Sequence, residues 1–100
     1  MERLSTQTIT ELMAGLPGWT YDGPNRSINR ELTFRDFRDA FAFMTDVAAV
    51  ADRMDHHPTW TNTYNRVEIM LTTHDADGLT MRDIEMARAI DAAAAARTLE

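Results

Sequence analysis

Three histidines are the residues of this chain best suited to chemistry: His56, His57 and His74. An imidazole gains and loses a proton near neutral pH, because its unperturbed pKa is about 6.5. General acid–base catalysis needs a side chain with this property. A carboxylate near an imidazole can orient the ring, and five aspartates lie close by in the sequence: Asp52, Asp55, Asp75, Asp77 and Asp83. The histidines could therefore supply the acid and the base of a proton-transfer reaction.

Structural roles could account for the same histidines without catalysis. The adjacent pair His56 and His57 could form a polar cap at the end of a helix, where the helix dipole favours a positive charge. His74 could be a solvated residue at the end of a strand. Spacing alone does not favour catalysis over these roles.

A site with three histidine ligands for a metal is a further alternative. His56 and His57 form a poor ligand pair, because neighbouring side chains usually diverge. The sequence also contains none of the HxH, HxxxH or HExxH spacings. We therefore expect no metal. With no cysteine and no GxSxG sequence, the chain also lacks a thiolate or an esterase-type serine nucleophile.

Composition limits the remaining classes of function. A length of 100 residues predicts one domain over residues 1–100, with a thin core that association could reinforce. The net charge of −6 lacks the basic excess that nucleic-acid binding requires. No apolar run is long enough to span a bilayer, and we expect no signal segment, because Glu2 and the polar residues 5–8 lie where one would be. We expect a cytoplasmic protein, although a cysteine-free secreted protein would fit the cysteine count equally well.

The elements that must position the histidines begin with a short helix over residues 5–14. Ser5 is its expected N-cap. Two strands should follow, at residues 19–22 and around residues 28–34, separated by the turn residues 23–25. Trp19 is expected in the core.

A long helix should lead to the first two histidines. Thr33 and Asp36 have the spacing of a capping box, which predicts that the helix starts there. Pro58 cannot continue a helix, so the helix should end around Asp55 with His56 and His57 on its exit. One apolar stripe is expected along it: Phe37, Phe41, Met44, Val47, Ala48, Ala51 and Met54.

The last part of the chain should add two strands, at residues 58–62 and 64–73, and a final helix over residues 81–97. Thr80 and Asp83 again have capping-box spacing, and the buried face should include Ile84, Ala87 and Ile90. The order α-β-β-α-β-β-α predicts an α+β two-layer sandwich. Helices should cover one face of a four-stranded antiparallel sheet, which leaves the other face for solvent or dimerisation.

Several stretches resemble the pterin-4a-carbinolamine dehydratase family, whose pattern is HHPxW, YNxVxxxLxTH and GLTxxD. Residues 55–60 read DHHPTW, residues 63–67 TYNRV, residues 71–75 LTTHD and residues 78–80 GLT, followed by Asp83. The segment LPGW at residues 16–19 and the strand around residues 28–34 are also similar to the family. The resemblance covers about residues 4–92.

The resemblance implies a lyase that dehydrates 4a-hydroxytetrahydropterin to quinonoid dihydropterin, a step of tetrahydrobiopterin recycling. The leaving hydroxyl needs a proton and N5 must lose one, so no cofactor is implied. The family pattern implies that His56 and His74 form the acid–base pair, while His57 holds the pterin. It also implies that Pro58 and Trp60 shape the pocket wall. Two aspartates are implied to support the site: Asp52, where the family often has glutamate, and Asp83, which could orient His74 or only cap its helix.

The resemblance also bears on partners. Family members are dimers or tetramers, which implies a homodimer or homotetramer here. Animal members act as dimerisation cofactors of a homeodomain transcription factor, and other relatives assist the assembly of partner proteins. The alternative function is therefore a non-catalytic interaction protein on the same fold.

Overall fold

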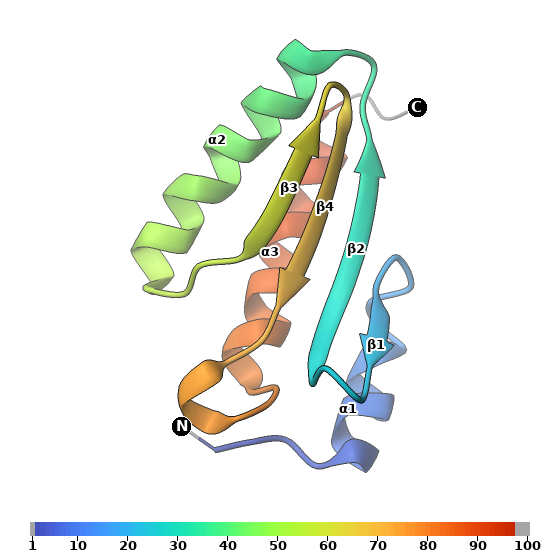
Figure 1. Cartoon of the computed structure of the whole chain (residues 1–100), viewed down its shortest axis with the longest axis vertical. Helices are drawn as coiled ribbons and strands as arrows, with labels where there is room; N and C mark the ends of the chain where they lie inside the picture. Colours follow the sequence, from blue (N-terminus) through green and yellow to red (C-terminus); the bar gives the residue numbers. More distant parts are fainter. Residues whose placement is uncertain (1, 98–100) are drawn as a thin grey trace.

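The computed structural model describes residues 2–97 as three helices packed on one open sheet (Figure 1). The sheet has four strands in the order β1-β2-β4-β3, and every neighbouring pair is antiparallel. The predicted α+β sandwich and its element order are confirmed. In chain order the elements are α1 Thr6–Met13, β1 Thr20–Asp22, β2 Ser27–Thr33, α2 Phe37–Met54, β3 Thr59–Thr63, β4 Arg66–Leu71, the 3-10 helix η1 His74–Ala76, and α3 Met81–Ala95.

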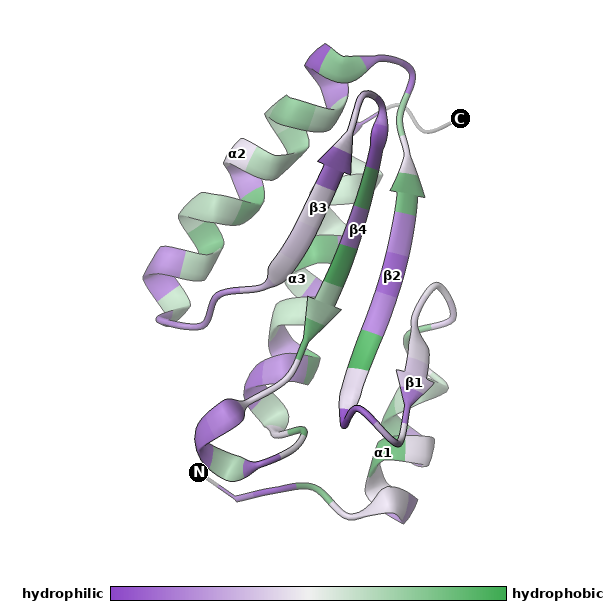
Figure 2. Ribbon diagram, viewed as in Figure 1, coloured by the Kyte–Doolittle hydropathy of each residue, from purple (hydrophilic) through white to green (hydrophobic). Residues whose placement is uncertain are grey.

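The core lies between the sheet and the helices α2 and α3, which both cover the same face (Figure 1). Strand β4 shows why the layers form, because its side chains alternate between the two faces. Val67, Ile69 and Leu71 are buried, whereas Arg66 and Glu68 are exposed on the other face. Figure 2 shows the same alternation of apolar and polar residues along β4. The predicted alternation is confirmed.

The start of α2 differs from the prediction. Thr33 is the last residue of β2 and pairs with Arg66 of β4, so it cannot cap a helix. Asp36 is the N-cap instead, and its carboxylate accepts a hydrogen bond of 2.9 Å from the backbone N–H of Asp39. The capping box predicted for Thr33 and Asp36 is therefore wrong, because sheet pairing extends further than the local spacing suggested.

The apolar stripe predicted along α2 is also partly wrong. The buried residues of the helix are Ala40, Phe43, Val47 and Ala51. Phe37 and Phe41, which belong to the predicted stripe, are 47% and 55% exposed, and Ala48 is exposed as well. Apolar residues lie on more than one side of this helix, and only its contacts with α3 and β4 decide which side is buried.

The last helix follows the sequence pattern closely. Thr80 and Asp83 form the predicted capping box, and Ile84, Ala87 and Ile90 are fully buried. Trp19 is 5% exposed and lies in the core as expected. Within residues 2–97, no helix combines the length and the apolar character needed to cross a membrane.

Candidate active site

The three histidines converge on one pocket of about 280 Å³, although they come from two separate segments. His56 and His57 follow the end of α2, and His74 begins η1 after β4. The pocket lies where the exit of α2 meets the connection from β4 to α3. Its lining is completed by Asp55, Thr72, Thr73, Asp75 and Arg82.

The end of α2 turns the adjacent histidines in different directions. Asp55 caps the helix in the left-handed conformation, with a φ of 52°, which aspartate tolerates better than most residues. The helix ends there as predicted, and the backbone N–H of His56 still bonds to the carbonyl of Ala51 at 3.0 Å. This turn buries His56, which is 8% exposed, and leaves His57 exposed.

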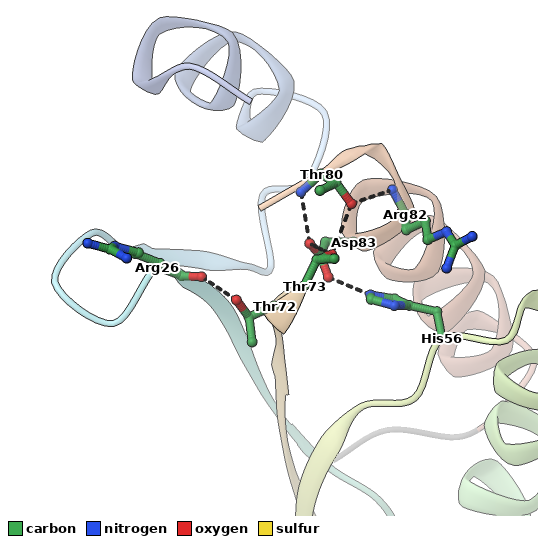
Figure 3. Close-up of polar contacts among 7 residues, drawn as sticks. All are labelled: Arg26, His56, Thr72, Thr73, Thr80, Arg82 and Asp83. Carbon is green, nitrogen blue, oxygen red and sulfur yellow. Dashed lines mark hydrogen bonds and ion pairs between the residues drawn. The ribbon is translucent and has the colours of Figure 1, made fainter. Parts of the chain in front are cut away.

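His56 is held by Asp83, a fully buried carboxylate at the start of α3 (Figure 3). The distance from Nε2 of His56 to Oδ1 of Asp83 is 2.6 Å. The other oxygen, Oδ2, accepts hydrogen bonds from the Thr80 N–H at 2.9 Å and from the Thr73 hydroxyl at 2.8 Å. A buried carboxylate is costly unless it is hydrogen-bonded, and here all three donors satisfy it. Asp83 therefore caps its helix and also contacts His56 rather than His74.

Each hydroxyl group near Asp83, that of Thr73 and that of Thr80, can donate its proton to only one partner. The hydroxyl of Thr73 donates its single proton to Asp83, so it can only accept from Thr80, whose Oγ1 lies 2.9 Å away. Thr80 in turn accepts from the backbone N–H of Arg82 at 3.2 Å (Figure 3). This chain of bonds ties the end of the β4 segment to the start of α3 and keeps the acceptor Oδ1 facing His56.

His57 has a carboxylate partner of a different kind. Its Nε2 lies 2.9 Å from Oδ1 of Asp52, which is on the preceding turn of α2. The side chains of His57 and Asp52 are 58% and 82% exposed, so solvent screens their attraction. Asp52 can thus orient the ring, but the pair adds little to stability.

His74 is exposed and differs from the other two histidines. Within residues 2–97, its ring has neither a hydrogen bond nor an ion pair. Its backbone carbonyl accepts a hydrogen bond from the N–H of Asp77 at 3.0 Å, which closes η1. The sequence predicted a strand through residue 73, whereas β4 ends at Leu71 and Thr73 forms only an isolated bridge with Gly78. The position of His74 therefore depends on the backbone of this loop.

Pro58 and Trp60 do not line the pocket that the three histidines share. Trp60 is paired with Ile69 in the sheet, so its side chain lies on the helix-covered face and packs against the core. Pro58 is half-buried in the link between His57 and β3. The structure thus places neither of these side chains in the lining of that pocket.

Sequence reasoning missed Arg82, Thr72 and Thr73 as pocket residues. Arg82 is the second residue of α3, and its guanidinium makes no hydrogen bond or ion pair within residues 2–97. No local signal in the sequence indicates it, because neighbouring residues of a helix face different directions. Thr73 precedes His74 directly, but its bond to Asp83 depends on how β4 meets α3.

A larger hollow of about 400 Å³ lies along the sheet and contains no histidine. Its polar lining includes Glu31 and Glu68, which face one another across β2 and β4. Within residues 2–97, no group of three acidic or histidine side chains is arranged to hold a metal ion. The three imidazoles gather instead at the smaller pocket.

Comparison with known proteins agrees with the pattern of residues. Residues 2–93 match the family described as pterin 4 alpha carbinolamine dehydratase. A protein of Bradyrhizobium sp. (strain ORS 278), provisionally named pterin-4-alpha-carbinolamine dehydratase, is 52% identical over 96 residues, which are 96% of each chain. The crystal structure of a transcriptional coactivator/pterin dehydratase from Brucella melitensis superposes with a TM-score of 0.90 at 42% identity, covering 93% of this chain and 99% of that one.

A more distant structure shares the fold alone. It is described as a pterin dehydratase-like protein that is a RuBisCO assembly factor in the alpha-carboxysome. Its TM-score is 0.68 at 22% identity, and the match covers 77% of this chain and 89% of that one.

The match to the family over nearly the whole sequence, together with the close structural likeness at 42% identity, shows that this chain belongs to the pterin 4 alpha carbinolamine dehydratase family.

Proposed function

We propose that this chain is a hydro-lyase that dehydrates a 4a-hydroxytetrahydropterin to the quinonoid dihydropterin. The observation that carries the proposal is the convergence of His56, His57 and His74 on one pocket, with His56 anchored to the buried Asp83. Membership of the family supports the same reaction class. A cysteine-free chain fits the reducing cytoplasm, where the reaction would serve pterin recycling.

The reaction needs one proton donated and one removed. The bond between C4a and its hydroxyl breaks, and the hydroxyl leaves as water after it receives a proton. The proton on N5 is lost as the C4a–N5 double bond forms, so the products are quinonoid dihydropterin and water. The pterin exchanges no electrons with another molecule, and the proposal includes no metal or cofactor.

His56 and His74 are proposed as the acid–base pair. The hydrogen bond to Asp83 occupies Nε2 of His56 and leaves its Nδ1 to exchange a proton with the substrate. A carboxylate partner stabilises the cationic ring, which suits His56 to accept the N5 proton. We propose that His74, which lines the same pocket and has no carboxylate partner in the described chain, protonates the leaving hydroxyl.

His57 is proposed to hold the pterin rather than to transfer its protons. Its ring is oriented by Asp52 and stands at the exposed side of the pocket. The pterin ring has a polar edge of amide and amino groups, and an imidazole and a carboxylate can donate to and accept from such an edge. Pro58 and Trp60, which lie outside the pocket, are proposed to support β3 and the link from His57.

The test is to measure dehydration of chemically prepared carbinolamine by stopped flow. The variants His56→Ala and His74→Ala should each lower the rate by about 10²–10⁴-fold, the range typical of general acid–base groups. Thr45→Ala, a change at an exposed position of α2 outside the pocket, is the control. Rates equal to wild type in both histidine variants would rule out the assignment.

We also infer that the protein associates with a second copy of itself, as a homodimer or as part of a homotetramer. Phe37, Phe41, Met44 and Ala48 follow at three- and four-residue steps, so they lie along one side of α2. Phe37 and Phe41 stack with their ring centroids 5.6 Å apart although both are about half exposed. Met44 is half-buried against the core, whereas Phe37, Phe41 and Ala48 are exposed, and an exposed apolar row of this kind marks an interaction surface.

The charges on α2 favour a second copy in antiparallel orientation. Arg38 is exposed near the first turn and Asp52 is exposed near the last turn. Two antiparallel copies of α2 would bring these opposite charges together and would also oppose the two helix dipoles. The same surface is the observation behind the alternative function, a non-catalytic interaction protein. That protein would bind partners in stoichiometric amounts and show no pterin turnover.

A further inference from the structure

The loop that carries His74 is held from outside the pocket. Because the ring of His74 makes no hydrogen bond within residues 2–97, its distance from His56 depends on the backbone of residues 72–78. Thr73 and Gly78 close this loop with two backbone hydrogen bonds, of 3.1 and 3.3 Å. Those bonds define the loop but do not fix its position relative to the rest of the sheet.

The segment before α1 crosses the end of this loop (Figure 1). The backbone N–H of Leu4 donates to the carbonyl of Leu79 at 2.8 Å. The side chain of Arg3 lies directly over Gly78, where an added Cβ would come within 2.7 Å of Cδ of Arg3. Gly78 has a φ of 158°, and its lack of a side chain allows Arg3 to lie this close.

Asp77, the last residue before Gly78, is bound by two arginines from different segments. Its carboxylate forms an ion pair with Arg26 of the β1–β2 turn, and Arg3 lies 4.0 Å from the same oxygen. Its backbone carbonyl also accepts hydrogen bonds from Arg3 at 3.3 Å and from Arg26 at 3.5 Å. Asp77 is thus the point at which both segments contact the loop.

Arg26 also contacts the start of the loop, at Thr72. Its backbone carbonyl accepts a hydrogen bond of 2.7 Å from the hydroxyl of Thr72 (Figure 3). The next residue, Thr73, bonds to Asp83, the carboxylate that orients His56. One residue of the β1–β2 turn therefore contacts both ends of the segment that contains His74.

We propose that Arg26 and Arg3, acting through Asp77, are positioning residues that keep His74 at its working distance from His56. This inference rests on the proposed dehydration, in which both rings act on one substrate. The side chains of Arg3, Arg26 and Asp77 are all more than half exposed. Solvent screens such pairs, so their loss should misplace His74 without unfolding the protein.

The first measurement is steady-state dehydration of the carbinolamine by full-length variants. Asp77→Asn removes the charge, and asparagine tolerates the left-handed φ of 55° at this position. Asp77→Asn and the double variant Arg3→Gln/Arg26→Gln should each lower kcat by about 3- to 10-fold, with KM within about 2-fold. The triple variant should be no slower than the double variant, because replacing both arginines already removes every contact of their side chains with Asp77.

The matched control is Asp46→Asn, which makes the same charge change in the ion pair between Asp46 and Arg97. Arg97 follows the end of α3, whereas the His74 loop precedes its start, so the control lies about 20 Å or more away. It should keep the wild-type kcat. The positioning role would be overturned if kcat were unchanged in both Asp77→Asn and the double variant. It would also be overturned if kcat of the triple variant fell by the product of the two separate losses.

The second measurement follows the His74 ring signals and the amide exchange of residues 74–78 by NMR, which needs no turnover. In Asp77→Asn the His74 signals should shift and the loop amides should exchange faster, while both stay unchanged in Asp46→Asn. If the wild type shows no turnover, the proposed dehydration fails and this measurement alone decides the positioning role. Unshifted His74 signals in Asp77→Asn would then refute it.

Discussion

The replacement Asp83→Asn tests the most detailed feature of the site, because it changes one buried oxygen into an amide nitrogen. Oδ2 of Asp83 accepts from Thr80 and Thr73, and Oδ1 accepts from His56. An asparagine offers one oxygen, which satisfies the two donors at the Oδ2 position. Its NH₂ group then faces Nε2 of His56, so two donors meet unless the ring changes tautomer.

The tautomer change has a predictable effect on catalysis. Nε2 must become an acceptor, and the proton of the neutral ring moves to Nδ1. The proposed base is then lost, because Nδ1 no longer accepts a proton and no carboxylate stabilises the cationic ring. We expect kcat/KM for dehydration to fall by about 10²–10³-fold, within the range that general acid–base groups contribute.

The same replacement has a predictable effect on stability. Hydrogen bonds to a charged group contribute about 1.5–3 kcal/mol each, and Asp83 is fully buried, so solvent does not screen the loss. For a domain of this length, a loss of about 2 kcal/mol lowers Tm by roughly 10 °C. Thermal unfolding followed by circular dichroism measures this shift, and the variant should still be folded at 25 °C.

A double-mutant cycle separates the catalytic effect from the structural one. In a His56→Ala background, Asp83→Asn should cause no further loss of dehydration, since its effect passes through His56. Stopped-flow rates of the two single variants and the double variant complete the cycle. A folded Asp83→Asn enzyme within about 3-fold of the wild-type rate would refute the reasoning.

Two further predictions concern the exposed parts of the structure. Phe41→Asp should convert the self-associated protein to a monomer in light scattering at micromolar concentration with little change in Tm, because Phe41 is 55% exposed. Ala49→Asp, at another exposed position of α2, should leave the association intact, and a wild-type monomer would contradict the inference. Asp52→Asn should raise KM for the carbinolamine by about 2- to 5-fold with a similar kcat, because its exposed pair with His57 orients a binding group. A lower kcat at unchanged KM in steady-state assays would argue against that role.

Much of the fold could be predicted because its signals are local. Three features each depend on a few consecutive residues: the alternation in β4, the end of α2 at Asp55 before Pro58, and the capping box of Thr80 and Asp83. The start of α2 could not be predicted in the same way. Thr33 has the spacing of a cap, but its pairing with Arg66 in the sheet takes precedence.

The sequence of α2 alone could not predict which of its faces is buried. Phe37 and Phe43 are equally apolar, yet Phe37 is 47% exposed and Phe43 is fully buried. A helix with apolar residues on more than one side can pack in several rotations. The contacts with α3 and β4 select one of them and leave Phe37 and Phe41 exposed.

The sequence by itself determined which residues could do chemistry, which family they resemble and in what order the elements follow. Only the tertiary structure decided how those residues meet. Asp83 could be recognised as a cap from its neighbour Thr80, but its contact with His56 joins residues from the end of α2 and the start of α3. That contact exists because α2 packs against α3, and the place of His74 likewise depends on Arg3 and Arg26, which are distant from it in sequence. Spacing along a chain reports local geometry, whereas the site is made by packing between segments.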